Sequence, residues 1–277
     1  PRVAGAVLHL RAPDAEPATR DALAAAVRRT RAAGKRVVAY AATLDAATYP
    51  LACACDAILL QPGGGVGTLG VRRAFPFLAD SLARVGLAFE AVRISPFKSA
   101  ADLLTERALT PEARQMVGWL TDDAYDAVVD AIAAGRGLPI DVVRERIDGA
   151  PYTDEEALAL GLVDGLVGAE DLPAHLGSPG APAAVVPWKR AAGALLPRPP
   201  DAPGRHVALI RIEGLIVDGE SRSRPPGPGA PLVGEARCGD ATVVAEARRA
   251  LEDDAVAAAV VWIDSPGGSS TASEAIA

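Results

Sequence analysis

The sequence has few cysteines, few aromatic residues and no long apolar run, and each shortage excludes a class of protein. Three cysteines in 277 residues are too few for a disulfide framework. The spacing of Cys53 and Cys55 does not match a zinc knuckle, so we expect small core residues and no metal site. No apolar run reaches the roughly 18 residues that cross a bilayer. The formal charge of −7 argues against a nucleic-acid surface, which needs a basic footprint.

Half of the residues are hydrophobic and only 4% are aromatic, which predicts a core built from Ala, Val, Leu and Ile. Strand-like and helical segments alternate along the chain, and this order predicts an α/β fold with a mostly parallel sheet. The run Val256–Ile263 is apolar throughout, as expected for a strand buried on both faces. We expect strands at 3–10, 36–42, 57–60, 89–94, 206–212 and 256–263, and helices at 21–33, 110–134, 141–147, 154–160 and 240–251.

Composition also predicts two domains that form a diverged repeat. Residues 177–204 are rich in Pro, Gly and Ala, which indicates a linker between a first domain at 1–176 and a second at 205–277. Residues 6–16 align with residues 260–269 when Pro13 is matched to Pro266, so that strand, turn and helix correspond. The first copy has Asp-Ala-Glu at 14–16, where the second has Gly267-Gly268-Ser269.

The Pro266-Gly267-Gly268 turn is the first candidate for chemistry. Glycine lets the main chain approach a ligand, and the start of the following helix offers free N–H donors, which suit a phosphate or a developing oxyanion. An ordinary tight turn is the competing interpretation. Thr271 and Glu274 have the spacing of a capping box, and the serines nearby are typical capping residues rather than nucleophiles.

The second candidate is Lys98, because a serine nucleophile needs a base. The three histidines, His9, His175 and His206, do not lie in loops suited to a catalytic triad. Only three of the 28 basic residues are lysines, and unlike arginine a desolvated lysine can give up its proton. Lys98 lies among apolar and small residues in the run SPFKSA (95–100), although an ordinary solvated lysine is also compatible with this setting.

Four segments together resemble the protease IV, or signal peptide peptidase A, family. They are FKSA (97–100), LTPEARQMV (109–117), ALIRIEGLIVDGE (208–220) and the stretch 239–276, and they follow the family's order along almost the whole chain. The resemblance implies a Clp-protease/crotonase-like tandem repeat in its long, two-domain form, with the second copy truncated. It also implies a serine peptidase with a Ser/Lys dyad, in which Lys98 is the general base. The backbones of Gly267 and Gly268 would form the oxyanion hole.

The resemblance further implies that the nucleophile lies beyond residue 277, so residues 1–277 are expected to be inactive alone. The matching position in the first repeat, residues 41–49, contains no serine. The family's substrates are signal-peptide-like apolar peptides, and it needs no cofactor. Its members are homo-oligomers at the cell membrane, facing the periplasm or exterior, which implies an anchoring segment not present here.

Two other functions stay open at this point. A crotonase-like acyl-CoA enzyme would also use a glycine-rich oxyanion hole, although no basic residue flanks Pro266-Gly267 to hold the CoA phosphates. A non-catalytic scaffold subunit of the same fold would need no nucleophile at all.

Overall fold

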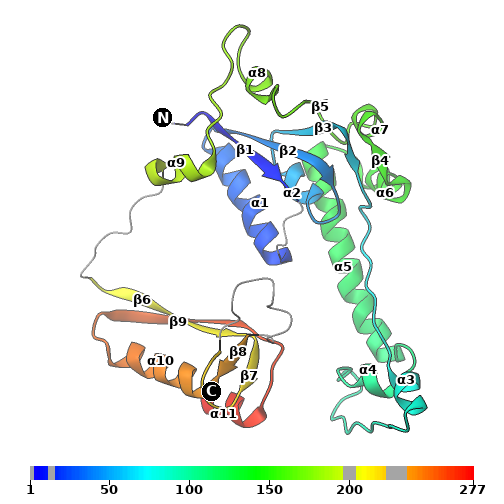
Figure 1. Ribbon diagram of the computed structural model, residues 1–277, viewed down its shortest axis with the longest axis vertical. Helices are drawn as coiled ribbons and strands as arrows, with labels where there is room; N and C mark the ends of the chain where they lie inside the picture. Colours follow the sequence, from blue (N-terminus) through cyan, green and yellow to red (C-terminus); the bar gives the residue numbers. More distant parts are fainter. Residues whose placement is uncertain (1–2, 12–15, 196–203, 223–235) are drawn as a thin grey trace. The chain divides into compact units, whose positions relative to one another are not determined.

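The computed structural model describes residues 3–11, 16–195, 204–222 and 236–277, which belong to two compact units (Figure 1). The first unit is Pro1–Val186 and the second is Pro187–Ala277. The predicted linker, 177–204, contains a helix, α9 (Trp188–Leu195). Pro187 precedes this helix and Gly193 lies within it, so a segment rich in Pro and Gly can still contain a helix. Composition alone therefore overestimated the length of the irregular segment.

The first unit contains a five-stranded, mostly parallel sheet, which confirms the predicted fold class. Strands β1 (Gly5–Leu10), β2 (Arg36–Leu44) and β3 (Ala57–Val66) run parallel to one another. The short strand β5 (Gly165–Leu166) is parallel to β3, and β4 (Tyr152–Thr153) is antiparallel to it. The central strand β2 is buried on both faces, which explains its continuous apolar sequence.

Helices cover both faces of this sheet. One face packs against α1 (Pro17–Ala32), α2 (Tyr49–Cys53) and α5 (Pro111–Arg136), with Ala39, Leu60 and Ile132 in the shared core. The other face packs Val38 and Tyr40 against Leu172 of α8 (Leu172–Leu176). Two further helices, α6 (Ile140–Gly149) and α7 (Asp154–Ala159), follow α5.

Helix α5 begins and ends where the sequence predicts. The Thr110 hydroxyl accepts a hydrogen bond from the Ala113 N–H, and Pro111 fills the first helical position, where a missing N–H costs nothing. The helix ends at Gly137, whose φ of 64° is left-handed. The C-terminal half of α5 is buried in the core through Val128, Val129 and Ile132.

Residues 71–109, here called the arm, lie at the other end of α5. Figure 1 shows the two short helices of the arm, α3 (Ala79–Arg84) and α4 (Asp102–Thr105), beside the N-terminal end of α5, away from the sheet. The strand expected at 89–94 is not formed, because no neighbouring strand is available in the described chain to pair with it. The arm instead exposes large apolar side chains: Phe75, Leu78, Val85, Leu87, Phe89, Val92, Ile94, Phe97 and Leu103.

In its described residues, the second unit contains two small parallel sheets and two helices after α9. Strand β6 (His206–Glu213) pairs with β9 (Val256–Asp264), and β7 (Leu215–Val217) pairs with β8 (Arg237–Gly239). Helix α10 (Asp240–Glu252) covers one side through Val243, which packs with Ile210 and Ile212. Helix α11 (Ser270–Ile276) follows β9.

The expected burial of β9 on both faces is wrong for the described chain. Val260, Val261, Trp262 and Ile263 are each more than half exposed, because the described core of this unit includes residues of β6 and none of β9. The predicted counterparts β1 and β9 are both parallel strands that a helix follows. Residues 12–15, which include the predicted counterpart of the glycine turn, lie outside the described residues.

Candidate active site

The turn between β9 and α11 needs glycine at two successive positions, for different reasons. Gly267 has a φ of 103°, a backbone conformation that residues with a side chain rarely adopt. Gly268 has ordinary φ, but a Cβ atom there would overlap the carbonyl oxygen of Ile216 in β7. The glycine pair therefore lets the turn lie directly against β7.

Hydrogen bonds to β7 leave one N–H group of this turn free. The Ile216 N–H donates to the Gly267 oxygen at 3.0 Å, and the Ser269 N–H donates to the Ile216 oxygen at 2.9 Å. This parallel bridge uses both backbone groups of Ile216, so the N–H of Gly268 points away from β7. Within the described residues it has no hydrogen-bond acceptor. The N–H of Gly267 instead donates to Ser265 Oγ at 3.1 Å. Of the two predicted oxyanion donors, Gly268 is therefore the available one.

The serines around the turn have structural roles. Ser265 Oγ donates to the Gly214 carbonyl at 2.6 Å, and Ser273 Oγ donates to the Ser269 carbonyl at 2.8 Å. Ser269 is the N-cap of α11 and accepts from the Ala272 N–H at 3.3 Å. The capping box expected at Thr271 is therefore wrong by two residues, because the helix begins at Ser270, immediately after the tight turn.

Lys98 lies in the arm, in a pair of tight turns between α3 and α4. Its N–H donates to the Ser95 carbonyl at 3.1 Å, and the Ser99 N–H donates to the Phe97 carbonyl at 3.1 Å. The Lys98 side chain is exposed. The first unit by itself does not bury the Lys98 amine, because the apolar neighbours of Lys98 are themselves in solvent. Ile94, for example, is 92% exposed and provides no low-dielectric surroundings. Burial of this amine at an interface with a second domain stays a prediction.

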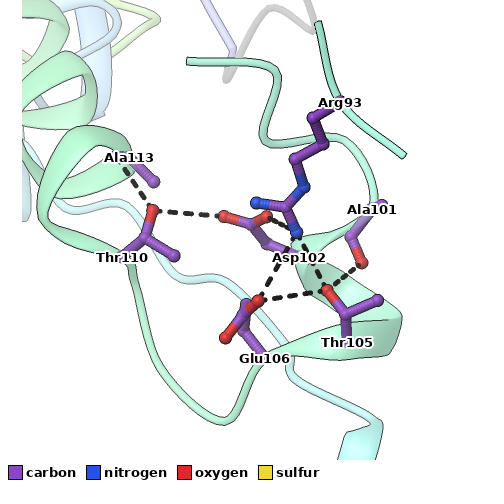
Figure 2. Close-up of polar contacts among 7 residues, drawn as sticks. All are labelled: Arg93, Ala101, Asp102, Thr105, Glu106, Thr110 and Ala113. Carbon is purple, nitrogen blue, oxygen red and sulfur yellow. Dashed lines mark hydrogen bonds and ion pairs between the residues drawn. The ribbon is translucent and has the colours of Figure 1, made fainter. Parts of the chain in front are cut away.

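A polar network that we did not predict holds the Lys98 segment together (Figure 2). Arg93 Nη2 lies 2.8 Å from Asp102 Oδ1 and 3.5 Å from Glu106 Oε1, and it donates to Thr105 Oγ1 at 3.0 Å. The Arg93–Asp102 contact has the distance of an ion pair but not the angle of a hydrogen bond, so Asp102 Oδ1 is a buried acceptor without a hydrogen-bond donor in the described chain. Thr110 Oγ1 lies 3.5 Å from the other oxygen of Asp102. The only feature of the sequence that could have indicated this network is the pair of opposite charges, Arg93 and Asp102, on either side of the mostly apolar segment 94–101.

In residues 41–49 of the first unit, the hydroxyls of Thr48 and Tyr49 are used in hydrogen bonds, whereas Thr43 is exposed. Thr48 is buried, and its Oγ1 donates to Asp45 Oδ1 at 2.8 Å and accepts from the Asp45 N–H at 2.9 Å. The Tyr49 hydroxyl donates to the Leu162 carbonyl at 2.6 Å. A cavity of about 750 Å³ lies at the carboxyl ends of β1, β2 and β3, lined among others by His9 and Tyr40. Residues 41–49 contain no serine, and the loss of a nucleophile from the first repeat stays a prediction.

Two further expectations concern metals and membranes. The described residues hold no cluster of His, Cys, Asp and Glu that could bind a metal ion, and Cys53 and Cys55 are buried free thiols. Burial raises the pKa of each of these thiols to about 12. Among the helices that the structure describes, none is long and apolar enough to cross a membrane.

Several proteins that are named as proteases are similar to this chain. The chain is 26% identical over 282 residues to the chloroplastic serine protease SPPA of Arabidopsis thaliana, an alignment that covers 99% of the chain and 40% of that protein. It is 27% identical over 301 residues to Protease 4 of Haemophilus influenzae, covering 100% of the chain and 45% of that protein. A protein of Synechocystis sp. with a protease name is 37% identical over 122 residues, which is 44% of the chain and 43% of that protein.

The chain thus spans 40% to 45% of the length of these relatives. Among solved structures, a membrane-bound stomatin-specific protease aligns with 59% of the chain and 64% of its own, at 13% identity and a TM-score of 0.35. That likeness is too slight to place any residue. Residues 29–178, more than half of the chain, match the description Peptidase family S49. The chain belongs to peptidase family S49.

Proposed function

We propose that these residues are part of a serine endopeptidase with a Ser/Lys dyad. Lys98 is the general base, and the turn at 265–268 forms the oxyanion hole. The nucleophilic serine lies outside residues 1–277. The observation that carries the proposal is the N–H of Gly268, which has no acceptor among the described residues and is fixed between a strand end and a helix start by two hydrogen bonds between the turn and Ile216. Membership of a peptidase family supports peptide hydrolysis over acyl-CoA chemistry.

The chemistry assigns each group one task. The uncharged Lys98 amine takes the proton from the serine hydroxyl as its oxygen attacks the peptide carbonyl. The carbonyl oxygen becomes an oxyanion, to which the Gly268 N–H donates a hydrogen bond. Gly267 contributes only if its N–H releases Ser265 Oγ. The protonated lysine then donates its proton to the leaving amine, and water hydrolyses the acyl-enzyme.

The base needs to be covered before it can act. Burial favours the uncharged form of a lysine amine, but in the first unit Lys98 is exposed. The proposed enzyme therefore includes a further surface over the arm, and the exposed apolar side chains there are suited to being covered. The proposal extends to apolar, signal-peptide-like substrates and a homo-oligomer. It also includes attachment at the membrane, facing the periplasm or exterior, through a segment outside residues 1–277.

The test uses a longer form of the protein that includes the nucleophile. Lys98→Ala and Lys98→Arg should both abolish cleavage of a signal-peptide-like substrate, because a guanidinium keeps its proton near neutral pH. Lys189→Arg, at another exposed lysine, is the matched control and should cleave like the wild type. Wild-type turnover by Lys98→Arg would rule out the base.

A second comparison tests the location of the nucleophile. Residues 1–277 alone should neither cleave the substrate nor react with a serine-directed covalent probe, because a base without a nucleophile forms no acyl-enzyme. Mass spectrometry of the probe-treated protein identifies any labelled residue. Labelling of Ser269 in the short form would contradict the proposal and make the turn itself the nucleophile.

A further inference from the structure

We propose that the ion pair between Arg93 and Asp102, here called the clamp, positions Lys98 for catalysis. The inference rests on the proposed function, because it concerns the setting of the same base. Arg93 and Asp102 touch no substrate in this scheme. They are positioning residues that act through the segment between them.

The clamp joins the two ends of the segment that carries Lys98. Arg93 lies before the segment and Asp102 after it, so their 2.8 Å contact closes residues 94–101 into a loop. Within the loop the supports are short turns, such as the Lys98 N–H to the Ser95 carbonyl and the Asp102 N–H to the Ser99 carbonyl. Single turns of this kind are weak, so the closed ends restrict the loop more than its internal bonds do.

The burial of Asp102 makes Arg93 hard to replace. Asp102 is 4% exposed, and Arg93 is the only residue in the described chain that forms an ion pair with it. A carboxylate removed from water needs a charged partner, and the loss of that partner leaves an uncompensated buried charge. The segment would then have to open and admit water to Asp102, and this opening would move Lys98.

The clamp also ties the segment to the rest of the first unit. Thr110 Oγ1, which caps α5 by accepting from the Ala113 N–H, lies at 3.5 Å from Asp102 Oδ2 (Figure 2). Arg93 additionally donates to Thr105 of α4. The loop is therefore fixed against the beginning of α5, whose other half is anchored in the core. This gives Lys98 a defined place relative to the sheet rather than only a local conformation.

The arm offers a matched control for the clamp. Arg107 and Asp80 form a second Arg–Asp pair at 2.7 Å, but their side chains are 78% and 62% exposed. Exposed pairs of this kind contribute little to stability. Arg93→Met and Arg107→Met make the same chemical change at almost the same contact distance, one at the clamp and one at the surface. Arg93→Lys is the conservative variant, which keeps the charge at position 93.

The first measurement is hydrogen exchange of residues 1–277, followed by mass spectrometry. Arg93→Met should speed exchange in peptides covering 94–101 by about 10-fold or more, which corresponds to losing the clamp as a local closing contact. Exchange in residues 119–136 of α5 should stay unchanged, and Arg107→Met should match the wild type throughout. Faster exchange in α5 as well would mean general unfolding, and an unchanged loop would mean no clamp. Either result overturns the inference.

The second measurement is steady-state kinetics of the longer, active form. Arg93→Met should lower kcat by about 10- to 100-fold at nearly constant KM, since a displacement of about 1 Å in a reacting group costs on this order. Arg93→Lys should recover part of the loss, and Arg107→Met should retain full turnover. If Lys98→Ala is inactive while Arg93→Met is fully active, the clamp is refuted and the base stands. If Lys98→Ala is active, the proposed function fails, whatever the loop does.

Discussion

Helix α5 contains two glycines, one in its interior and one in its last turn, for which we predict opposite effects of the same substitution. A Cβ atom at Gly118 would meet no atom within 4 Å. At Gly135 a Cβ atom would overlap the Cys53 carbonyl oxygen and lie 2.5 Å from Cys53 Cβ, because α5 and α2 approach closely there. Alanine therefore changes helix propensity alone at the first position, and propensity plus packing at the second.

The two magnitudes follow from these surroundings. Alanine is favoured over glycine in a helix interior by about 1 kcal/mol, so Gly118→Ala should stabilise by up to that amount. Gly135 lies in the last turn of α5, where the gain in propensity is smaller, and carbon atoms in contact need about 3.5–4.0 Å. Helix α5 must move away from α2 by roughly 1 Å, and such overpacking costs about 1–3 kcal/mol. The net expectation for Gly135→Ala is a destabilisation of up to about 2 kcal/mol.

Thermal unfolding followed by circular dichroism measures both variants in the 277-residue chain. The chain has two units, so more than one transition is expected, and the transition that both substitutions move belongs to the first unit. A change of 1 kcal/mol in a unit of this size shifts Tm by about 2–4 °C. We expect a rise for Gly118→Ala and a fall for Gly135→Ala. Equal shifts in one direction would refute the packing argument.

Two further predictions concern ionisable groups in the first unit. Burial alone would raise the pKa of Asp164, but hydrogen bonds from Arg136 and the Ile58 N–H outweigh it and lower the pKa. The ionised Asp164 side chain therefore stabilises the folded first unit fully at a pH above the ordinary carboxyl range. This stabilisation is lost as the pH falls through the lowered pKa of Asp164. Asp164→Asn should show a smaller drop in urea midpoint between pH 5 and pH 3 than the wild type, and an equal drop would contradict this. Cys53 and Cys55, with pKa values of about 12, should resist iodoacetamide at pH 8 in the native protein and react in urea; rapid native labelling would argue against their burial.

The parts of the fold that the sequence predicted are those whose signal is local. Thr110-Pro111 predicted the start of α5 because capping and proline chemistry act within one turn. The apolar runs at β2, β6 and β9 predicted strands for the same reason. The segment 89–94 has equal strand character but forms no strand, because a strand also needs a neighbour that its own residues do not specify.

The candidate site follows the same division. The two glycines of the 265–268 turn could be recognised from the sequence, because glycine is the residue type that such backbone conformations and close approaches require. The scarcity of lysine singled out Lys98, but not its exposure, since burial depends on what covers a side chain. The Arg93–Asp102 pair was missed because many opposite charges are equally far apart in this sequence, and only the folded arm brings these two together.

Because α5 is long, a small tilt of the helix at its anchored end produces a large displacement of the arm. From Thr110 to Val129, where the helix is anchored in the core, the distance is about 28 Å at 1.5 Å per residue. A tilt of about 5° at the anchor would therefore sweep the tip through roughly 2.5 Å, which is more than the about 1 Å that reacting groups tolerate. Under the proposed role of Lys98 as the base, the bending stiffness of α5 would help to set how precisely that base is positioned. Substitutions that curve the helix near Tyr125 should therefore displace Lys98, although Tyr125 is far from the proposed site.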